Sequence, residues 1–410
     1  MTTAPAGPRS AGISRAGHAV LVCGACVAAA VGLAAVAARH AHPAEVSPVV
    51  PSGSWNTAWI AGLVLALAFY GLGAAGASRT RVRLGLAVGI AVIVQSLPLV
   101  APLVLSKDAY LYWGEARVIT VHHANPYRVT PADFPQDPAL PFVAEQWRGL
   151  AAPYGPVWEA VATVPALAAG ASAHRAELGY RLLALAGVLT ALGLVARRTR
   201  STAAVALLGW NPLIALHFAG GGHSDAWMVA LLVFAVATRE TGWAGGSWPL
   251  SAGFKAFPLV LLPLELARTR FRQPRRFWLA LAGMGALTAA AGTAVFGARW
   301  ISASLLGAHQ SSPLGGVHWL MQAGLSHRES VVAGGLVFVL VYGALLASAW
   351  RHGRARLSLA TTALCLCSSL LRPWYALWPV ALAAVEEDAV AGVAAYALTA
   401  YLLLGDAVLL

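Results

Sequence analysis

A carboxylate at the end of an apolar run is the first side chain in this sequence that could do chemistry. Asp108 follows Ser106 and Lys107 and comes shortly before Tyr110. A carboxylate in this position can act as a general base that removes a proton from an acceptor hydroxyl. A single base opposite a leaving group also suits an inverting sugar transfer. The structural alternative is an interfacial charge that pairs with Lys107.

A second polar cluster, at residues 220–225, reads Gly-Gly-Gly-His-Ser-Asp. The glycines can end one helix, and Ser224 or Asp225 can cap the next. Capping is a sufficient structural reason for Asp225, but it does not explain His223. The imidazole can hydrogen-bond a phosphate or a hydroxyl, or it can orient Asp108. We therefore count His223 and Asp225 among the candidate substrate-binding residues, with a structural role for each as the alternative.

Two cations complete the set of candidate residues. Lys255 lies within an apolar stretch, where a lysine costs roughly 2.5–3.5 kcal/mol on insertion scales and therefore usually has a partner or a task. A fixed ammonium there would stabilise the charge that develops on a phosphate leaving group. The alternative is a side chain that reaches back to the membrane interface. Arg372 could hold phosphate oxygens through two parallel hydrogen bonds.

Aromatic residues gather beside the same motifs. We assign Tyr110, Tyr154, Trp374 and Tyr375 to the substrate site, because aromatic rings can stack on a sugar face. The alternative is that they form the aromatic belt of a membrane interface. The adjacent histidines 122–123 point in different directions on a helix or a strand, so we expect no resident metal or cofactor. A divalent ion bridging Asp108 and a phosphate stays an open alternative.

The composition indicates which kind of scaffold must position these residues. Hydrophobic residues make up 59% of 410 positions and charged residues 11%, about half the usual charged share of a soluble domain. Long apolar runs without period-two alternation predict an all-α, polytopic transmembrane helix bundle rather than a barrel. The runs lie at 18–38, 56–77, 84–105, 155–171, 178–196, 202–219, 225–238, 248–267, 277–296, 331–350, 357–371, 374–385 and 389–405.

The net charge of +12 comes mostly from short arginine-rich turns, which favours a role in topology over nucleic-acid binding. These turns lie at residues 79–83, 197–200, 268–276 and 351–356. All can face the cytoplasm only if the segments 155–171 and 248–267 fail to cross. We then expect about 11 full crossings, or about 11 to 13 membrane helices when short re-entrant ones are included. The N-terminus would be cytoplasmic and the C-terminus extracytoplasmic.

This topology places the candidate residues on one side. Residues 106–153 become the first large extracytoplasmic loop and residues 298–330 the second. Residues 220–225 and 372–375 face the same side. We therefore expect an active site at the extracytoplasmic face of the plasma membrane.

The order of these motifs resembles a known family. The motifs are Asp108-Ala109-Tyr110, Asn125-Pro126-Tyr127, Trp147-Arg148, Ala152-Pro153-Tyr154-Gly155-Pro156, Asn211-Pro212, Gly221-Gly222-His223-Ser224-Asp225, Lys255 and Pro373-Trp374-Tyr375. The series is similar to the actinobacterial polyprenol-phosphomannose-dependent mannosyltransferases, GT-C-type membrane enzymes that elongate α-1,6-mannan. A related α-1,2-mannosyltransferase group looks similar in outline. One departure is Ser224, where the family pattern often has Asn; a second is a chain that is short for the α-1,6 enzymes.

The resemblance implies a single GT-C-like membrane glycosyltransferase domain over residues 1–410. It also implies a polyprenyl-phosphate-mannose donor, a glycolipid or glycan acceptor in the cell envelope, and Asp108 as the family's loop aspartate. Two other classes stay open: a lipid or solute transporter or flippase, and an inactive scaffold of the same fold. Broken helices and intramembrane charge also occur in transporters. The sequence has no inverted repeat, which counts against transport.

Overall fold

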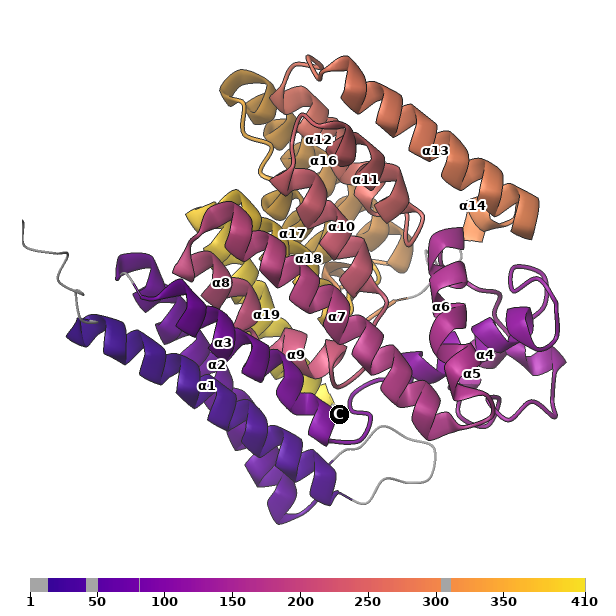
Figure 1. The fold of residues 1–410 in the computed structure, drawn as a ribbon, viewed down its shortest axis with the longest axis horizontal. Helices are drawn as coiled ribbons and strands as arrows, with labels where there is room; N and C mark the ends of the chain where they lie inside the picture. Colours follow the sequence, from indigo (N-terminus) through magenta and orange to yellow (C-terminus); the bar gives the residue numbers. More distant parts are fainter. Residues whose placement is uncertain (1–13, 42–50, 81, 304–310, 410) are drawn as a thin grey trace, which may run out of the picture.

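In a computed structural model that describes residues 14–41, 51–80, 82–303 and 311–409, the chain is a bundle of helices (Figure 1). No strand occurs within those ranges. Six of the helices there are long and apolar enough to cross a membrane. They are α1 (Arg15–His40), α2 (Ser54–Arg79), α7 (Ala173–Thr199), α13 (Arg275–Phe296), α16 (His327–His352) and α19 (Ala389–Leu409). The prediction of an all-α polytopic bundle is therefore confirmed.

Several shorter helices lie between these long ones along the chain. The third apolar run forms α3 (Leu84–Ser96) and the 3-10 turn η1 (Leu97–Val100). The predicted segment 202–219 is divided into α8 (Thr202–Gly209) and α9 (Pro212–Phe218), followed by α10 (Asp225–Ala237). The division occurs because Pro212 cannot donate a helical hydrogen bond. The side chain of Asn211 instead accepts from the backbone N–H of Ile214 and caps α9.

The predicted segment 248–267 is a hairpin of two short helices, α11 (Gly242–Ala252) and α12 (Pro258–Arg268). Each has 11 residues and rises about 16 Å, roughly half the thickness of a hydrocarbon core. Both outer ends of the hairpin lie together, since Arg268 pairs with Glu240 at 3.4 Å. Lys255 lies at the tip of the hairpin, in the turn between the two helices.

A second hairpin has the same construction. It consists of α17 (Leu357–Cys367), the 3-10 turn η4 (Pro373–Ala376) and α18 (Leu377–Glu386). Arg239, which follows α10, contacts Glu386 at 3.3 Å and Glu265 of α12 at 3.1 Å. The bases of both hairpins therefore meet at one end of the bundle. The tip of the second hairpin carries Arg372, Trp374 and Tyr375.

Two of the arginine-rich turns lie at this same end. Arg270 donates to the backbone carbonyl of Trp350 at 3.2 Å. Arg356, just after α16, contacts Asp388 at the start of α19 at 3.1 Å. The other two clusters lie in the α2–α3 turn and the α7–α8 turn. Arg81, which belongs to the α2–α3 cluster, falls outside the described residues.

Both predicted outer loops contain helices. Residues 106–153 include α4 (Asp108–Thr120), the 3-10 turn η2 (Pro131–Asp133) and α5 (Glu145–Arg148), and α6 (Pro156–Ala169) follows. Residues 298–330 include α14 (Trp300–Ala303), α15 (Gly316–Gln322) and the start of α16; positions 304–310 are outside the described residues. Figure 1 shows α4, α5 and α6 grouped at one side of the bundle. Asp108 thus begins a helix instead of following one directly.

Candidate active site

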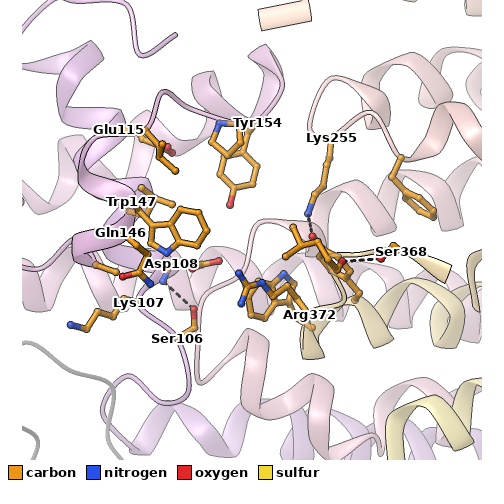
Figure 2. Close-up of a pocket in the computed structure, with 18 of the residues that line it drawn as sticks. Ser106, Lys107, Asp108, Glu115, Gln146, Trp147, Tyr154, Lys255, Ser368 and Arg372 are labelled. Carbon is orange, nitrogen blue, oxygen red and sulfur yellow. Dashed lines mark hydrogen bonds between the residues drawn. The ribbon is translucent and has the colours of Figure 1, made fainter. Parts of the chain in front are cut away.

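A cavity of about 930 Å³ lies between the α4–α5 region and the tips of the two hairpins. Its size is within the range of ligand pockets. Figure 2 shows Asp108, Glu115, Gln146 and Trp147 on one side, and Lys255, Ser368 and Arg372 on the other. Segments far apart in the sequence therefore build one chamber, and its two walls differ in charge.

Asp108 occupies the first position of α4 and lines this cavity. Its backbone N–H donates to the hydroxyl of Ser106 at 3.1 Å. The Oδ2 atom of Asp108 lies 3.3 Å from Nδ1 of His223, whose side chain is fully buried. The imidazole stacks face to face on Trp374, with ring centroids 3.8 Å apart and an interplanar angle of 15°. Asp108 thus has one partner that is itself fixed by packing.

The local chain geometry explains why a histidine can reach this aspartate. Gly222 has φ of +78°, a conformation that favours glycine. A Cβ at Gly222 would also come within 3.3 Å of Ala109 Cβ. The α9–α10 connection therefore passes close against the start of α4, and this close approach delivers His223 to Asp108.

The charges around Asp108 favour its ionised form. Burial opposes ionisation, but His223, Arg372 and the Ser106 hydroxyl together hold the pKa of Asp108 below its ordinary value. Burial lowers the pKa of His223, while the neighbouring Asp108 counteracts part of that effect. At neutral pH the carboxylate can therefore accept a proton, as a general base must.

The opposite wall carries the ammonium group of Lys255, which already has partners within the protein. Lys255 Nζ lies 3.3 Å from Asp225 Oδ1 and 3.3 Å from the hydroxyl of Tyr375. It also lies 4.5 Å from the ring centroid of Tyr375 and 5.2 Å from that of Trp378. Trp378 Nε1 donates to the same Asp225 oxygen at 2.8 Å. These partners offset the cost of burying the charge.

Arg372 is the second cation of this wall. Its guanidinium carbon lies 6.0 Å from the ring centroid of Trp147 and 5.9 Å from that of Trp374. Within the described ranges it makes no ion pair closer than 4.0 Å. The guanidinium is therefore held between two indoles, with its hydrogen-bond donors available to a ligand.

The structure places the predicted site residues in three groups. Asp108, Tyr154, Lys255, Arg372, Trp374 and Tyr375 line the cavity. His223 and Asp225 lie directly behind it, where they contact Asp108 and Lys255. Tyr110 does not line the cavity; its hydroxyl donates to Glu177 at 3.2 Å.

Two further residues of this region had no role in the sequence-based prediction. Glu115 lines the cavity and is 2% exposed. Its spacing of seven residues from Asp108 places both carboxyl groups on one face of a helix, a signal that the sequence did contain. Gln146 lies on α5 in the same wall, and its position in the sequence gave no signal of a role in the site. Trp147 was noticed in the sequence as part of the family motif series, but it was not among the predicted site residues.

Arg181 on α7 holds together the two segments that precede the Asp108–His223 pair. Its Nη2 donates to the carbonyls of Pro98 and Ala101, at 2.7 and 2.8 Å. Its Nε donates to the carbonyl of Ala219 at 2.7 Å. The Glu177 carboxylate accepts from Nη1 at 2.7 Å and neutralises the buried charge. Nothing in the sequence indicated this role, because all three carbonyl partners are remote along the chain.

Metal-ligating side chains do not converge here: in the described ranges, no group of three His, Cys, Asp or Glu residues could hold an ion. The expectation that the protein has no resident metal stays a prediction.

Comparison with known proteins finds one matching family and several relatives of this chain. Residues 11–269, more than half of the chain, match the family described as "Alpha-(1->6)-mannopyranosyltransferase, N-terminal domain". A probable α-(1→6)-mannopyranosyltransferase of Mycolicibacterium smegmatis is 30% identical over 196 residues, covering 46% of this chain and 33% of the relative. α-(1→6)-Mannopyranosyltransferase A of Mycobacterium tuberculosis is 27% identical over 193 residues, covering 45% and 36%. α-(1→6)-Mannopyranosyltransferase B of Corynebacterium glutamicum is 28% identical over 171 residues, covering 38% and 28%.

The matched region spans only about a third of the length of these curated relatives. No solved structure matches the chain.

Proposed function

The chain belongs to the α-(1→6)-mannopyranosyltransferase family, and from this premise we propose that it is a glycosyltransferase that moves a mannosyl residue to an acceptor hydroxyl. The proposed donor is a polyprenyl-phosphate mannose, and the proposed acceptor is a glycolipid or glycan of the cell envelope. The observation that carries the proposal is the cavity itself, in which an ionised Asp108 faces Lys255 and Arg372 across one chamber. A base opposite two cations is what transfer from a sugar phosphate requires.

The cationic wall suits the phosphate of the donor. Lys255 and Arg372 lie at the tips of two hairpins and can approach one anion from two directions. The Arg372 guanidinium offers parallel donors to two phosphate oxygens, and Lys255 offers a point charge. Leu364, Cys365 and Phe257 continue the same wall with apolar side chains. This apolar continuation is suited to the first isoprene units of a lipid carrier.

The reaction then follows from the positions of the charges. The Asp108 carboxylate takes the proton from the acceptor hydroxyl. At the same time the oxygen of that hydroxyl attacks the anomeric carbon of the donor sugar. The bond between that carbon and the phosphate oxygen breaks, and the phosphate keeps the electron pair. Lys255 and Arg372 stabilise the negative charge that the leaving phosphate gains. Attack opposite the leaving group inverts the anomeric centre.

The arrangement of the elements also supports a location and an orientation in the membrane. We infer that the end of the bundle with the hairpin bases and arginine-rich turns faces the cytoplasm, as in the positive-inside rule. The cavity would then open to the extracytoplasmic side of the plasma membrane. Nine crossings result, formed by α1, α2, α3 with η1, α7, α8 with α9, α10, α13, α16 and α19. This is fewer than the sequence suggested, because segments 357–371 and 374–385 form the second hairpin.

The test is transfer by the purified protein in lipid nanodiscs, with radiolabelled polyprenyl-phosphate mannose and a set of short mannosyl acceptors. We expect Asp108→Asn to reduce the rate of transfer by about 10²- to 10⁴-fold, the usual contribution of a general base. Donor binding should persist, since Lys255 and Arg372 remain. Asp133→Asn, an exposed acid of the η2 turn, is the matched control. Full transfer by Asp108→Asn, or donor movement across the bilayer without any glycoside product, would overturn the proposal.

A further inference from the structure

We propose that the α4–α5 wall of the cavity is the acceptor subsite, and that it binds an uncharged, hydroxyl-rich sugar through Glu115. The inference rests on the proposed function and assigns the second substrate of that reaction to particular side chains. It concerns the wall opposite Lys255 and Arg372 (Figure 2).

The distribution of charge between the walls is the first argument. The α4–α5 wall carries the acids Asp108 and Glu145 with one cation, Lys107, while Lys255 and Arg372 belong to the hairpin tips. A wall with a net negative charge repels a phosphate, and a wall with two cations attracts it. The two substrates of a transfer from a lipid phosphate differ in this same property, because the donor is anionic and a glycan hydroxyl is neutral. The charge pattern therefore separates donor and acceptor.

Glu115 is the second argument. Its side chain is 2% exposed and lines the cavity, and its Oε2 atom has no hydrogen-bond partner among the described residues. A buried carboxyl oxygen without a partner is costly, and a ligand hydroxyl in the cavity would remove that cost. Glu115 lies seven residues after Asp108, roughly 10 Å along α4. A sugar held by Glu115 can therefore present another of its hydroxyls to Asp108.

The neighbours of Glu115 decide its charge. Burial, with the carboxyl groups of Glu159 on α6 and Asp108 on α4, raises the pKa of Glu115 well above its ordinary value. The other titratable groups that face it are the phenols of Tyr127, Tyr154 and Tyr180. A protonated carboxyl can donate one hydrogen bond to a hydroxyl and accept another. It also does not compete with Asp108 as a base.

Aromatic side chains supply the apolar part of the subsite. Trp147 lines the cavity on the same wall, and Tyr154 lines it just above (Figure 2). The flat ring of either residue can cover the apolar face of a pyranose. The exposed amide of Gln146 lies at the rim and can exchange hydrogen bonds with further hydroxyls. Uncharged polar groups and aromatic rings together are what an uncharged sugar requires.

The experiment separates the two substrates by measuring two reactions. One is transfer to a short α-1,6-linked mannoside as the acceptor is varied, and the other is hydrolysis of the donor when no acceptor is present. We expect Glu115→Leu to raise the acceptor KM about 10- to 100-fold, because a hydrogen bond to a buried polar group is lost. Donor hydrolysis should stay at the wild-type rate. Glu115→Gln keeps the shape and should retain most of the acceptor affinity. Glu387→Gln, an exposed acid in the α18–α19 turn, is the control.

The pH dependence gives a readout that a packing role would not produce. Glu115 is protonated below its raised pKa, so the wild-type acceptor KM should rise as pH increases through that value. In Glu115→Gln the same rise should be absent. An unchanged acceptor KM in Glu115→Leu, or an equal fall in donor hydrolysis and transfer, would overturn the subsite. If the wild type neither hydrolyses the donor nor transfers mannose, the proposed function itself fails.

Discussion

At the scale of single residues, the Asp108–His223–Trp374 stack holds the carboxylate that we propose as the base. His223 is fully buried and does not line the cavity, so it is a positioning residue instead of a catalytic one. Its ring plane is fixed by the indole below it, and its Nδ1 fixes one oxygen of Asp108. The other oxygen can face the acceptor. Helix capping accounts for Ser224 and Asp225 in this turn but not for His223. Contact with one oxygen of Asp108 gives the histidine a role of its own.

We expect His223→Gln to move the acidic limb of the activity profile to higher pH. Asp108 works when ionised, so activity is present above its pKa and is lost as pH falls through it. In the variant, burial would no longer be opposed by His223, and the pKa of Asp108 would rise. The measurement is kcat/KM against pH, with His174→Gln, an exposed histidine of α7, as the control. An unmoved acidic limb would show that His223 does not support the base.

The sequence revealed those site residues whose charge is costly in an apolar setting. Lys255 was identified because an ammonium within an apolar run needs a partner, and the structure supplies that partner as Asp225. Arg181 is more deeply buried than Lys255, yet its carbonyl partners at Pro98, Ala101 and Ala219 cannot be found without the fold. Tyr110 carried the same aromatic signal as Tyr154, but the turn of α4 directs it toward Glu177. Side-chain direction was therefore the missing information.

At the scale of elements, the start of α6 is docked on the turn that carries Lys255. The backbone N–H groups of Gly155 and Val157 donate to the carbonyls of Phe254 and Gly253, at 3.0 and 2.9 Å. A Cβ on Gly155 would collide with the carbonyl of Gly253, so only glycine fits this contact. The first hairpin tip is thereby held in place by the outer segment that lines the other part of the cavity.

We expect Gly155→Ala to lower the free energy of unfolding by about 1–3 kcal/mol, the usual result of overpacking a close contact. The same displacement should weaken donor binding, because it shifts the turn that carries Lys255. Thermal unfolding in detergent and donor affinity are the two measurements. Gly89→Ala on α3 is the control, since a Cβ there meets nothing within 4 Å. Wild-type stability in Gly155→Ala would contradict the tight docking of α6.

Helix existence was easier to predict from the sequence than helix continuity. The long runs at 18–38, 56–77 and 331–350 each became one helix. The runs 202–219 and 248–267 are mostly apolar, although the second contains Lys255 and Glu265, and they became two helices each. Average hydropathy cannot register Asn211-Pro212, where the chain lacks a donor, whereas 248–267 was already expected to be a re-entrant segment. The helix α4 was missed because its polar and aromatic residues interrupt the apolar pattern.

At the scale of the whole molecule, charge and apolar surface are separated along the bundle. The described part of the chain has basic turns and paired acids at the hairpin bases, and the mixed-charge cavity near the hairpin tips. Helices α13 and α16 are apolar, and only 11% of their spanning windows is buried within the protein. Such exposed apolar helices are stable when lipid covers them.

We expect cysteine labelling in intact cells to distinguish the two ends. The four native cysteines would first be replaced, because Cys365 lines the cavity. A cysteine at the exposed Gln136, between η2 and α5, should react with a membrane-impermeant maleimide. One at the exposed His352, at the end of α16, should react only after permeabilisation. The reverse pattern would place the cavity on the cytoplasmic side and contradict the proposed orientation.

The contact between Lys255 and Asp225 has a consequence for the proposed catalytic cycle. The ammonium shares its charge with a carboxylate and two aromatic rings before any ligand arrives. An incoming anion therefore competes with the Asp225 carboxylate for Lys255. It gains less binding free energy than it would from an unpaired ammonium. In the proposed reaction, this partial neutralisation would shorten the time for which the leaving lipid phosphate stays bound. Because the proposed cavity would have to release this product before each new transfer, a moderate attraction would favour faster turnover than the tightest binding.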